Sequence, residues 1–162
     1  MNTLNDFFEL GMKRTIPQLL SAGPVAVNLG AGNSPIEGAH NLDLPAWDAT
    51  VDKIPFDDES VDTIYAFHFL EHVEPIRMLR EIERVLKIGG IANIVVPHRL
   101  GAIAFQDLDH KHFFTEETWR TLFQNDYYDK HREHPWRLHV HVNVIMGIVE
   151  RNLALFTQLV KK

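Results

Sequence analysis

The sequence lacks cysteine, has no long apolar run and carries no surplus of positive charge. Without cysteine, neither a disulfide framework nor a thiolate metal site can form. No run approaches the roughly 18 consecutive apolar residues that a membrane-spanning helix needs, and the N-terminus has no basic stretch of the kind that opens a signal peptide. We therefore expect a soluble, cytoplasmic protein without a membrane segment.

The charge balance is acidic, with 16 Lys and Arg residues against 22 Asp and Glu residues and a net charge of −6. Because the basic residues form no long cluster, a general nucleic-acid-binding surface is not expected. The 162 residues include 45% hydrophobic residues, enough apolar mass for one proper core. We find no internal repeat, low-complexity tract or long linker, so residues 1–162 are expected to form a single domain.

The most informative segment is an apolar run, Val25–Leu29, that breaks into Gly30-Ala31-Gly32. Such a break predicts a strand that ends in a tight turn, where the backbone can approach a nucleotide-like ligand without Cβ atoms in the way. Asp43 closes the next short apolar run and would lie beside that turn at the carboxyl edge of a parallel sheet. A carboxylate there can accept hydrogen bonds from both hydroxyls of a ribose.

Two details argue against a dinucleotide as the ligand. The pyrophosphate fingerprint needs a third glycine where Pro35 stands, and an acid about 20 residues further on, whereas Asp43 follows Gly32 by only 11 residues. No helix N-terminus would point at the turn, so a phosphate would lose its natural partner. The pattern favours a nucleoside with little negative charge, and S-adenosylmethionine fits.

Apolar periodicity and the glycine and proline positions predict strands alternating with helices. The expected helices are 3–21, which contains Pro17 as a point of kinking, 75–88, which Gly89 and Gly90 would stop, and a segment capped by Thr115; the expected strands are 25–30, 39–43, 61–67, 91–96, 136–148 and 153–160. We therefore predict an α/β fold with a Rossmann-like, mostly parallel sheet. It consists of an N-terminal helix within 1–22, a cofactor-binding core over 25–123 and a C-terminal antiparallel β-hairpin over 136–162.

Two side-chain patterns refine these elements. The helix at 75–88 shows an apolar stripe and a charged face: Ile76, Leu79, Ile82, Val85 and Leu86 are expected in the core, and Arg77, Arg80, Glu81, Arg84 and Lys87 in water. Between residues 138 and 148 every even position is apolar, which predicts one buried strand face. The unpaired edge of this long strand could support a homodimer.

The ordered motifs resemble the class I S-adenosylmethionine-dependent methyltransferases, most closely the small type 11 group. The resemblance covers roughly residues 25–123 and is carried by NLGAG at 28–32, NLD at 41–43, IPFDDESVD at 54–62, LEHV at 70–73 and ERVLKIGG at 83–90. It implies a compact class I methyltransferase architecture and S-adenosyl-L-methionine as the cofactor.

The resemblance also implies the site residues. Those implied to contact the cofactor are Gly30, Ala31, Gly32, Asp43, Leu44, Asp48, Ala49, Phe67 and His68. Asp48 and Ala49 would meet adenine, although Asp52 could serve in place of Asp48, and Phe67 and His68 would border the methionine end. The chain departs from the fuller pattern in three places: residues 33–38 replace a helix, the helix after Asp43 is largely missing, and Asn28 stands where an acid is frequent.

Methyl transfer asks little of the protein, because the methyl group already lies on a positively charged sulfur and reaction depends on alignment and on excluding water. A base is needed only where the acceptor must lose a proton. The candidates are His68, His98 and His110, with His112 beside the last, whereas His72 reads as a structural residue at a strand–helix junction.

The leading hypothesis is a methyltransferase acting on a small-molecule acceptor that the sequence does not identify. A second is a non-catalytic binding module with the same fold, which the shortened cofactor region favours. A third is a histidine-rich metal-binding protein built on residues 98–141. His139 and His141 have a spacing that can hold Zn²⁺ or Ni²⁺, but no third ligand is evident, so we assign no metal site.

Overall fold

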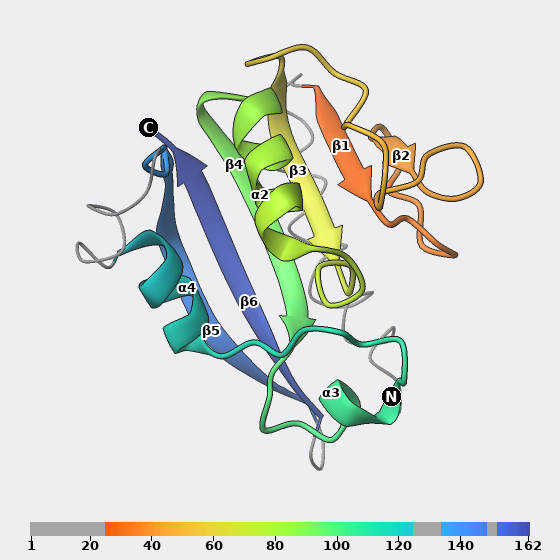
Figure 1. The fold of residues 1–162 in the computed structure, drawn as a ribbon, viewed down its shortest axis with the longest axis vertical. Helices are drawn as coiled ribbons and strands as arrows, with labels where there is room; N and C mark the ends of the chain where they lie inside the picture. Colours follow the sequence, from red (N-terminus) through yellow and green to blue (C-terminus); the bar gives the residue numbers. More distant parts are fainter. Residues whose placement is uncertain (1–24, 125–133, 149–151) are drawn as a thin grey trace.

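The computed structural model describes residues 25–124, 134–148 and 152–162. Within them a six-stranded sheet has the order β2-β1-β3-β4-β6-β5 (Figure 1). The elements are β1 (Ala26–Leu29), β2 (His40–Leu42), β3 (Val61–Phe67), α2 (Pro75–Val85), β4 (Leu86–Pro97), α3 (Ile103–Gln106), α4 (Glu116–Phe123), β5 (Leu138–Ile148) and β6 (Asn152–Lys161). The helix expected at 3–21 lies outside the described residues.

The sheet is mixed. β2, β1, β3 and β4 are parallel, β6 is antiparallel to β4, and β5 is antiparallel to β6. This confirms the predicted α/β class with a mostly parallel sheet and a C-terminal antiparallel pair. β6 lies inside the sheet, and β5, which precedes it in the sequence, forms the edge.

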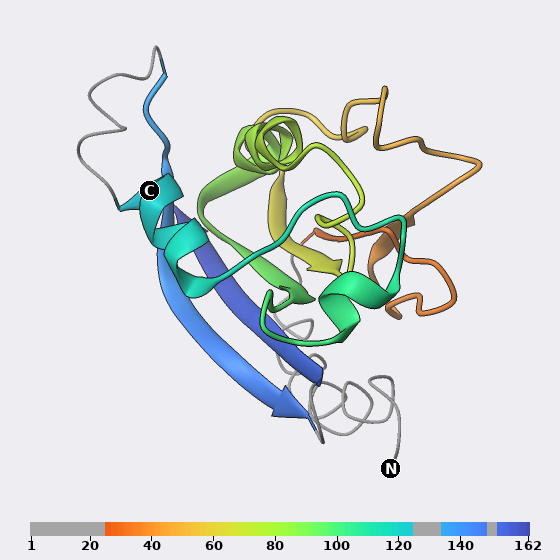
Figure 2. The same ribbon diagram turned by 60° about the horizontal axis from the view of Figure 1, so that its bottom comes forward.

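Helices α2 and α4 pack on the same face of the sheet (Figures 1 and 2). Their buried side chains join those of the strands in one hydrophobic core, in which Met78, Leu79 and Ile82 of α2 and Trp119 of α4 are fully buried. Thr115 is the N-cap residue of α4, as its sequence predicts, and its amide donates to the Thr118 hydroxyl at 3.0 Å. No helix in the described part of the chain is long and apolar enough to cross a membrane.

The prediction that the second helix runs to Ile88 is wrong, because α2 ends at Val85. The amides of Glu59 and Ser60 donate to the carbonyls of Arg84 and Val85, both at 2.9 Å. Two carbonyls at the end of the helix, which have no partner within it, are thus hydrogen-bonded. Leu86 is then extended and pairs with Val61 of β3. The two glycines predicted to stop the helix therefore lie within β4.

The predicted faces of α2 also need correction. Ile76 is 47% exposed, and Met78 takes its place in the core. Two of the three arginines expected in water bind the loop between β2 and β3. Arg77 donates to the carbonyls of Ala49 and Asp52, and Arg84 donates to those of Ile54 and Phe56. Helix α2 thus fixes the loop that follows β2.

The predicted alternation of buried and exposed side chains along β5 does not continue beyond Val140. Val140 pairs with Leu159 and Val142 pairs with Gln158, so His141 is an extra residue in the strand. Such a β-bulge exchanges the two faces for every residue that follows. Beyond it Asn143 donates to the Glu116 carbonyl of α4 at 3.0 Å, and Val144, expected in the core, is 47% exposed.

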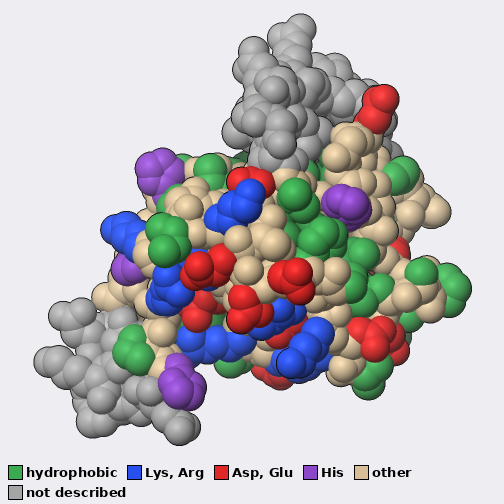
Figure 3. Space-filling view, turned by 90° about the horizontal axis from the view of Figure 1, so that it is seen from above, with side chains coloured by type: hydrophobic (Ala, Val, Ile, Leu, Met, Phe, Trp, Pro, Cys, Tyr) green, Lys and Arg blue, Asp and Glu red, His purple; other side chains and the backbone are tan. Residues whose placement is uncertain are grey.

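The amino-terminal edge of the parallel strands carries interspersed charges of both signs (Figure 3). Glu59 contacts Arg137 at 3.0 Å and Lys161 at 3.2 Å, while Arg84 contacts Glu81 and Asp58, both at 2.8 Å. The two arginines and the lysine hold the pKa values of Glu59 and Glu81 below their usual range, although burial, the largest influence on Glu81, opposes this. These pairs join β6, α2 and the loop before β3.

Candidate functional site

The candidate site lies at the carboxyl edge of the parallel strands, the lower edge in Figure 1. β1 lies between β2 and β3, so the connections from β1 to β2 and from β2 to β3 lead to opposite sides of it. Open α/β sheets bind ligands at such a switch point, outside the carboxyl ends of the strands. The segment from β4 to α4, including α3, lies across the same edge (Figures 1 and 2).

The glycine turn follows β1. Gly30 and Gly32 have φ values of +67° and +48°, the left-handed region that L side chains rarely adopt. The carbonyl of Leu42 in β2 accepts hydrogen bonds from the amides of Gly30 at 2.9 Å and Ala31 at 3.3 Å. The turn is therefore held against the end of β2.

The two glycines differ in their surroundings. A Cβ atom on Gly30 would lie 2.5 Å from Cδ2 of Phe69, which no side chain tolerates, whereas a Cβ on Gly32 would meet only Asp43 Oδ2, at 3.9 Å. Phe69 also packs against Trp47, with ring centroids 6.1 Å apart. Because Gly30 has no side chain, Phe69 in the turn after β3 can pack directly against the turn after β1.

Asp43 follows β2 and faces the glycine turn. Its Oδ2 atom accepts a hydrogen bond from the amide of Gly32, and its Oδ1 atom accepts one from the amide of Leu44 at 2.8 Å. Leu44 itself is exposed. The structure therefore brings Gly30, Ala31, Gly32 and Asp43 together, as the sequence predicts.

The side chains of Asn28 and Asn41 form hydrogen bonds that hold the loop found in place of a helix after the glycine turn. The Asn28 amide donates to Asn41 Oδ1 at 2.9 Å, and the same oxygen accepts from the amide of Ile36 at 2.8 Å. The Asn41 amide in turn donates to the carbonyls of Ile36 and Ala39, both at 3.0 Å. A network of side-chain amides thus holds residues 33–38 in place of a helix.

A cavity of about 340 Å³ lies beside Asp43. Its lining residues are Asn41, Leu42, Asp43, Ala46, Trp47, Asp52, Lys53 and Pro55. Asp48 is not among them: its Oδ1 atom accepts from the amide of Thr50 at 2.8 Å and from the Thr50 hydroxyl at 2.6 Å, which holds the pKa of Asp48 below its usual range. Ala49 packs against the core. The cavity therefore contains Asp52, the alternative to Asp48.

A second cavity, of about 680 Å³, follows β3. It is lined by His68, His72, Ile103, Gln106, Asp107, Leu108 and His110. His68 comes directly after Phe67, the last residue of β3, and has a φ of +51°. Two of the three predicted base candidates, His68 and His110, therefore share one cavity.

The third candidate, His98, lies outside the lining of this cavity and is 2% exposed. Its Nδ1 atom accepts from the amide of Leu100 at 3.2 Å, and its Nε2 atom lies 2.9 Å from Oε2 of Glu116. The backbone amide of Glu116 and His98 together lower the pKa of that carboxyl group. His98 thus joins the end of β4 to the start of α4.

Sequence reasoning gave no role to Glu71, which is fully buried beside His68 and His110, two of the three histidines that line the second cavity. The available signal was an acidic residue directly after the apolar pair Phe69-Leu70. His139 and His141 belong to no group of three metal-ligating side chains among the described residues; Glu71, His72 and His110 form such a group.

Comparison with known proteins supports the same architecture. Residues 26–94 match the family model described as Methyltransferase domain (Methyltransf_11). The search of curated proteins found no match for this chain.

Three solved structures illustrate the similarity in fold. The first is a chain of the complex between the Haloferax volcanii Trm112 methyltransferase activator and a putative methyltransferase, with 16% identity, coverage of 96% of this chain and 92% of the other, and a TM-score of 0.63. The second is a Thermotoga maritima SAM-dependent methyltransferase, a possible histamine N-methyltransferase. It has 17% identity, coverage of 98% of this chain and 94% of the other, and a TM-score of 0.56. The third is a putative type 11 methyltransferase from Sulfolobus solfataricus. It has 13% identity, coverage of 93% of this chain and 92% of the other, and a TM-score of 0.54. The predicted fold is confirmed, and the match over residues 26–94 bears out the resemblance to a type 11 methyltransferase domain.

Proposed function

We propose that this chain is an S-adenosylmethionine-dependent methyltransferase that acts on a small acceptor. The observation that carries the proposal is the Asp43 carboxylate closing the Gly30–Gly32 turn at the switch point of the sheet. The match of residues 26–94 to a methyltransferase domain supports it.

The residues around Asp43 fit an adenosyl group. A carboxylate offers about four acceptor positions, and the amides of Gly32 and Leu44 use two of them, which leaves two for ribose hydroxyls. The adjoining cavity of about 340 Å³ is of the size found for small-molecule sites, which start at about 300 Å³. Trp47 and Pro55 supply apolar walls for adenine, and Asp52 an acceptor for its amino group.

When bound, S-adenosylmethionine supplies a methyl group on a positively charged sulfur, and the acceptor supplies the electron pair for the new bond. The cavity of about 680 Å³ is the proposed acceptor site. Ile103 and Leu108 give it apolar walls, and Gln106 and Asp107 give it polar groups. These residues would orient a small acceptor.

We assign the base role to His68 and a secondary one to His110. Nδ1 of His68 lies 3.3 Å from Oε1 of the buried Glu71. A carboxylate at that distance stabilises the imidazolium that forms when the ring accepts the acceptor's proton. His98, which has both ring nitrogens engaged, is assigned to anchoring α4.

Calorimetric titration with S-adenosylmethionine and S-adenosylhomocysteine tests the proposal. We expect saturable binding of both, and binding that is at least tenfold weaker in Asp43→Asn. Asp57→Asn is the matched control, because Asp57 is an exposed acid that lines neither cavity. Absence of binding at millimolar ligand would sink the proposal and would favour the non-catalytic binding module.

A further inference from the structure

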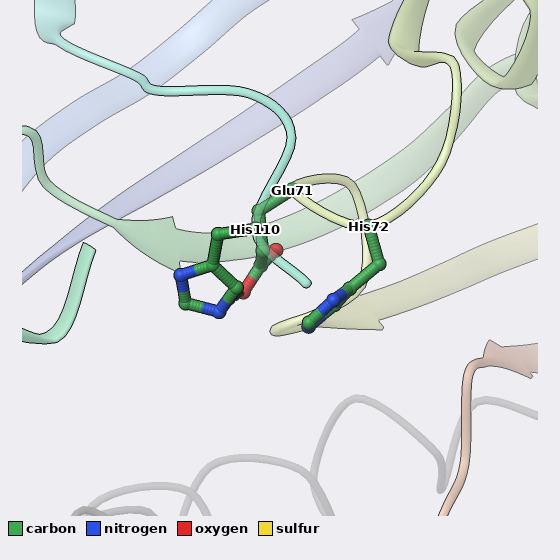
Figure 4. A group of neighbouring side chains, drawn as sticks. All are labelled: Glu71, His72 and His110. Atoms are coloured by element: carbon green, nitrogen blue, oxygen red, sulfur yellow. Dashed lines mark ion pairs between the residues drawn. The ribbon is translucent and has the colours of Figure 1, made fainter. Parts of the chain in front are cut away.

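Glu71, His72 and His110 form a compact group (Figure 4), and the two histidines line the larger cavity. One ligand atom from each residue lies within 4.8 Å of the others. Glu71 and His72 follow β3, whereas His110 belongs to the segment after α3. The amides of Lys111 and His112 donate to the Glu71 carbonyl at 2.8 and 3.2 Å, so the two segments are joined through the backbone.

The Glu71 carboxylate is buried without compensation from hydrogen bonds. The residue is fully buried, and neither carboxylate oxygen has a hydrogen-bond partner within the described residues. The nearby ring nitrogens, His68 Nδ1 at 3.3 Å and His110 Nε2 at 4.0 Å, both approach Oε1. A buried carboxylate is costly unless a cation or hydrogen bonds balance it, and a cation bound beside Glu71 would supply that balance.

Both histidines are oriented by backbone carbonyls. His72 Nδ1 lies 3.3 Å from the carbonyl oxygen of Asp109, and His110 Nδ1 lies 3.1 Å from that of Ala104. A carbonyl only accepts, so each Nδ1 carries the proton, and each Nε2 keeps its lone pair. Metal-binding histidines are held in this way by a carbonyl or carboxylate behind the ring.

We propose that Glu71, His72 and His110 bind a divalent transition-metal ion of the Zn²⁺ type. Two imidazoles and one carboxylate suit Zn²⁺, whereas Mg²⁺ and Ca²⁺ prefer oxygen ligands. Zinc ligands lie about 2 Å from the ion, so modest side-chain rotations must draw the three ligand atoms together. Asp107 Oδ2, which lies 3.8 Å from His110 Nε2, is placed to supply a fourth ligand.

If Asp107 does not bind the metal, the three residues leave one coordination position of a tetrahedral ion open. His72 and His110 line the same cavity as His68, so this position would face the acceptor and could bind an acceptor oxygen. That last step rests on the proposed function. Metal binding itself does not, because it requires neither cofactor nor methyl transfer.

The test is a ZnCl₂ titration of untagged, chelator-stripped protein, followed by calorimetry and by thermal unfolding. We expect one Zn²⁺ per chain and a rise in the unfolding midpoint of about 5–10 °C at a hundredfold excess over the dissociation constant. Glu71→Gln and His110→Ala should lose the site and the shift. MgCl₂ should give no shift.

The matched control is His139→Ala/His141→Ala, which removes two histidines of β5 and should leave the zinc stoichiometry unchanged. If Glu71→Gln fails to fold, the partly exposed His72→Ala serves instead, with circular dichroism to verify its fold. Zinc uptake that persists in these cavity variants, or a wild-type protein that neither takes up zinc nor gains stability from it, overturns the proposal. Because no S-adenosylmethionine is present, neither result bears on the proposed methyltransferase activity.

Discussion

Asp43 accepts a hydrogen bond from the main-chain amide of Gly32, so the acid expected to bind ribose also closes the turn beneath it. The two roles use different acceptor positions of one carboxylate. Substitutions at Asp43 therefore alter both the stability of the turn and its affinity for a nucleoside, and the two effects must be measured separately.

Asp43→Asn and Asp43→Ala should separate these effects. Asparagine keeps an oxygen for the Gly32 amide, so we expect little loss of stability but S-adenosylmethionine binding about 10- to 100-fold weaker, the equivalent of a hydrogen bond to a charged group. Alanine leaves the amide without its partner and should cost a further 1–2 kcal/mol or so in unfolding free energy. Urea unfolding and calorimetry measure the two quantities. Equal affinity of the wild type and Asp43→Asn for S-adenosylmethionine would show that Asp43 is not part of the binding site.

Gly30→Ala should destabilise the fold more than Gly32→Ala. Both alanines would have to adopt a left-handed backbone, at about 1–2 kcal/mol each. Only the Cβ at position 30 would also overlap Phe69, which adds about 1–3 kcal/mol. Urea unfolding measures the difference. In a Phe69→Ala background the excess cost at position 30 should shrink; an unchanged difference would show that the overlap is not its cause.

Asp52→Asn should weaken S-adenosylmethionine binding, whereas Asp48→Asn should not. Asp52 lines the cavity beside Asp43, while the Asp48 carboxylate is directed at Thr50. We expect a loss of about tenfold for Asp52→Asn, typical of one charge-assisted hydrogen bond. Calorimetric affinities compare the two variants directly. The reverse order would restore Asp48 as the residue that meets adenine.

Glu81→Gln should make the protein less stable at neutral pH and less sensitive to acid. Burial, the largest influence, opposes ionisation of Glu81, but Arg84 and the Ile54 amide outweigh it and lower its pKa below the usual 4.5. Its stabilising contribution is therefore complete above that value and is lost as the pH falls through the lower pKa of the folded state. Urea midpoints between pH 7 and pH 3 measure this loss.

Glu117→Gln is the matched control for that experiment. Glu117 and Arg120 also form a pair three residues apart on a helix, but both side chains are more than half exposed. Such a pair contributes about 0–1 kcal/mol, so the substitution should hardly change the acid profile. An equal response in both variants would mean that Glu81 does not stabilise the loop after β2.

Local signals predicted much of the fold and, of the first cavity, the position of Asp43 beside the glycine turn. The glycine turn and Asp43 are close in sequence, and both follow short apolar strands, so their meeting at one sheet edge could be foreseen. The end of α2 could not. Leu86 suits a helix or a strand equally, and its pairing with Val61 decides the outcome.

Non-local features account for the other differences. The apolar alternation of β5 continues past His141 in the sequence, yet the bulge there reverses the faces, and no glycine or proline marks it. The importance of Glu71 depends on His110, which lies 39 positions further along the chain and reaches it only through the folded loop after α3. Likewise, Asp52 can be distinguished from Asp48 only once the cavity is known.

The position of β6 between β4 and β5 imposes an order of assembly. As the ribosome releases the chain, β5 emerges before the only described strand to which it hydrogen-bonds in the sheet. Until β6 follows, β5 has no described strand beside it, and one edge of the largely buried, apolar strand β4 is unpaired. The nascent protein therefore passes through an interval in which strand addition by another molecule competes with its own completion.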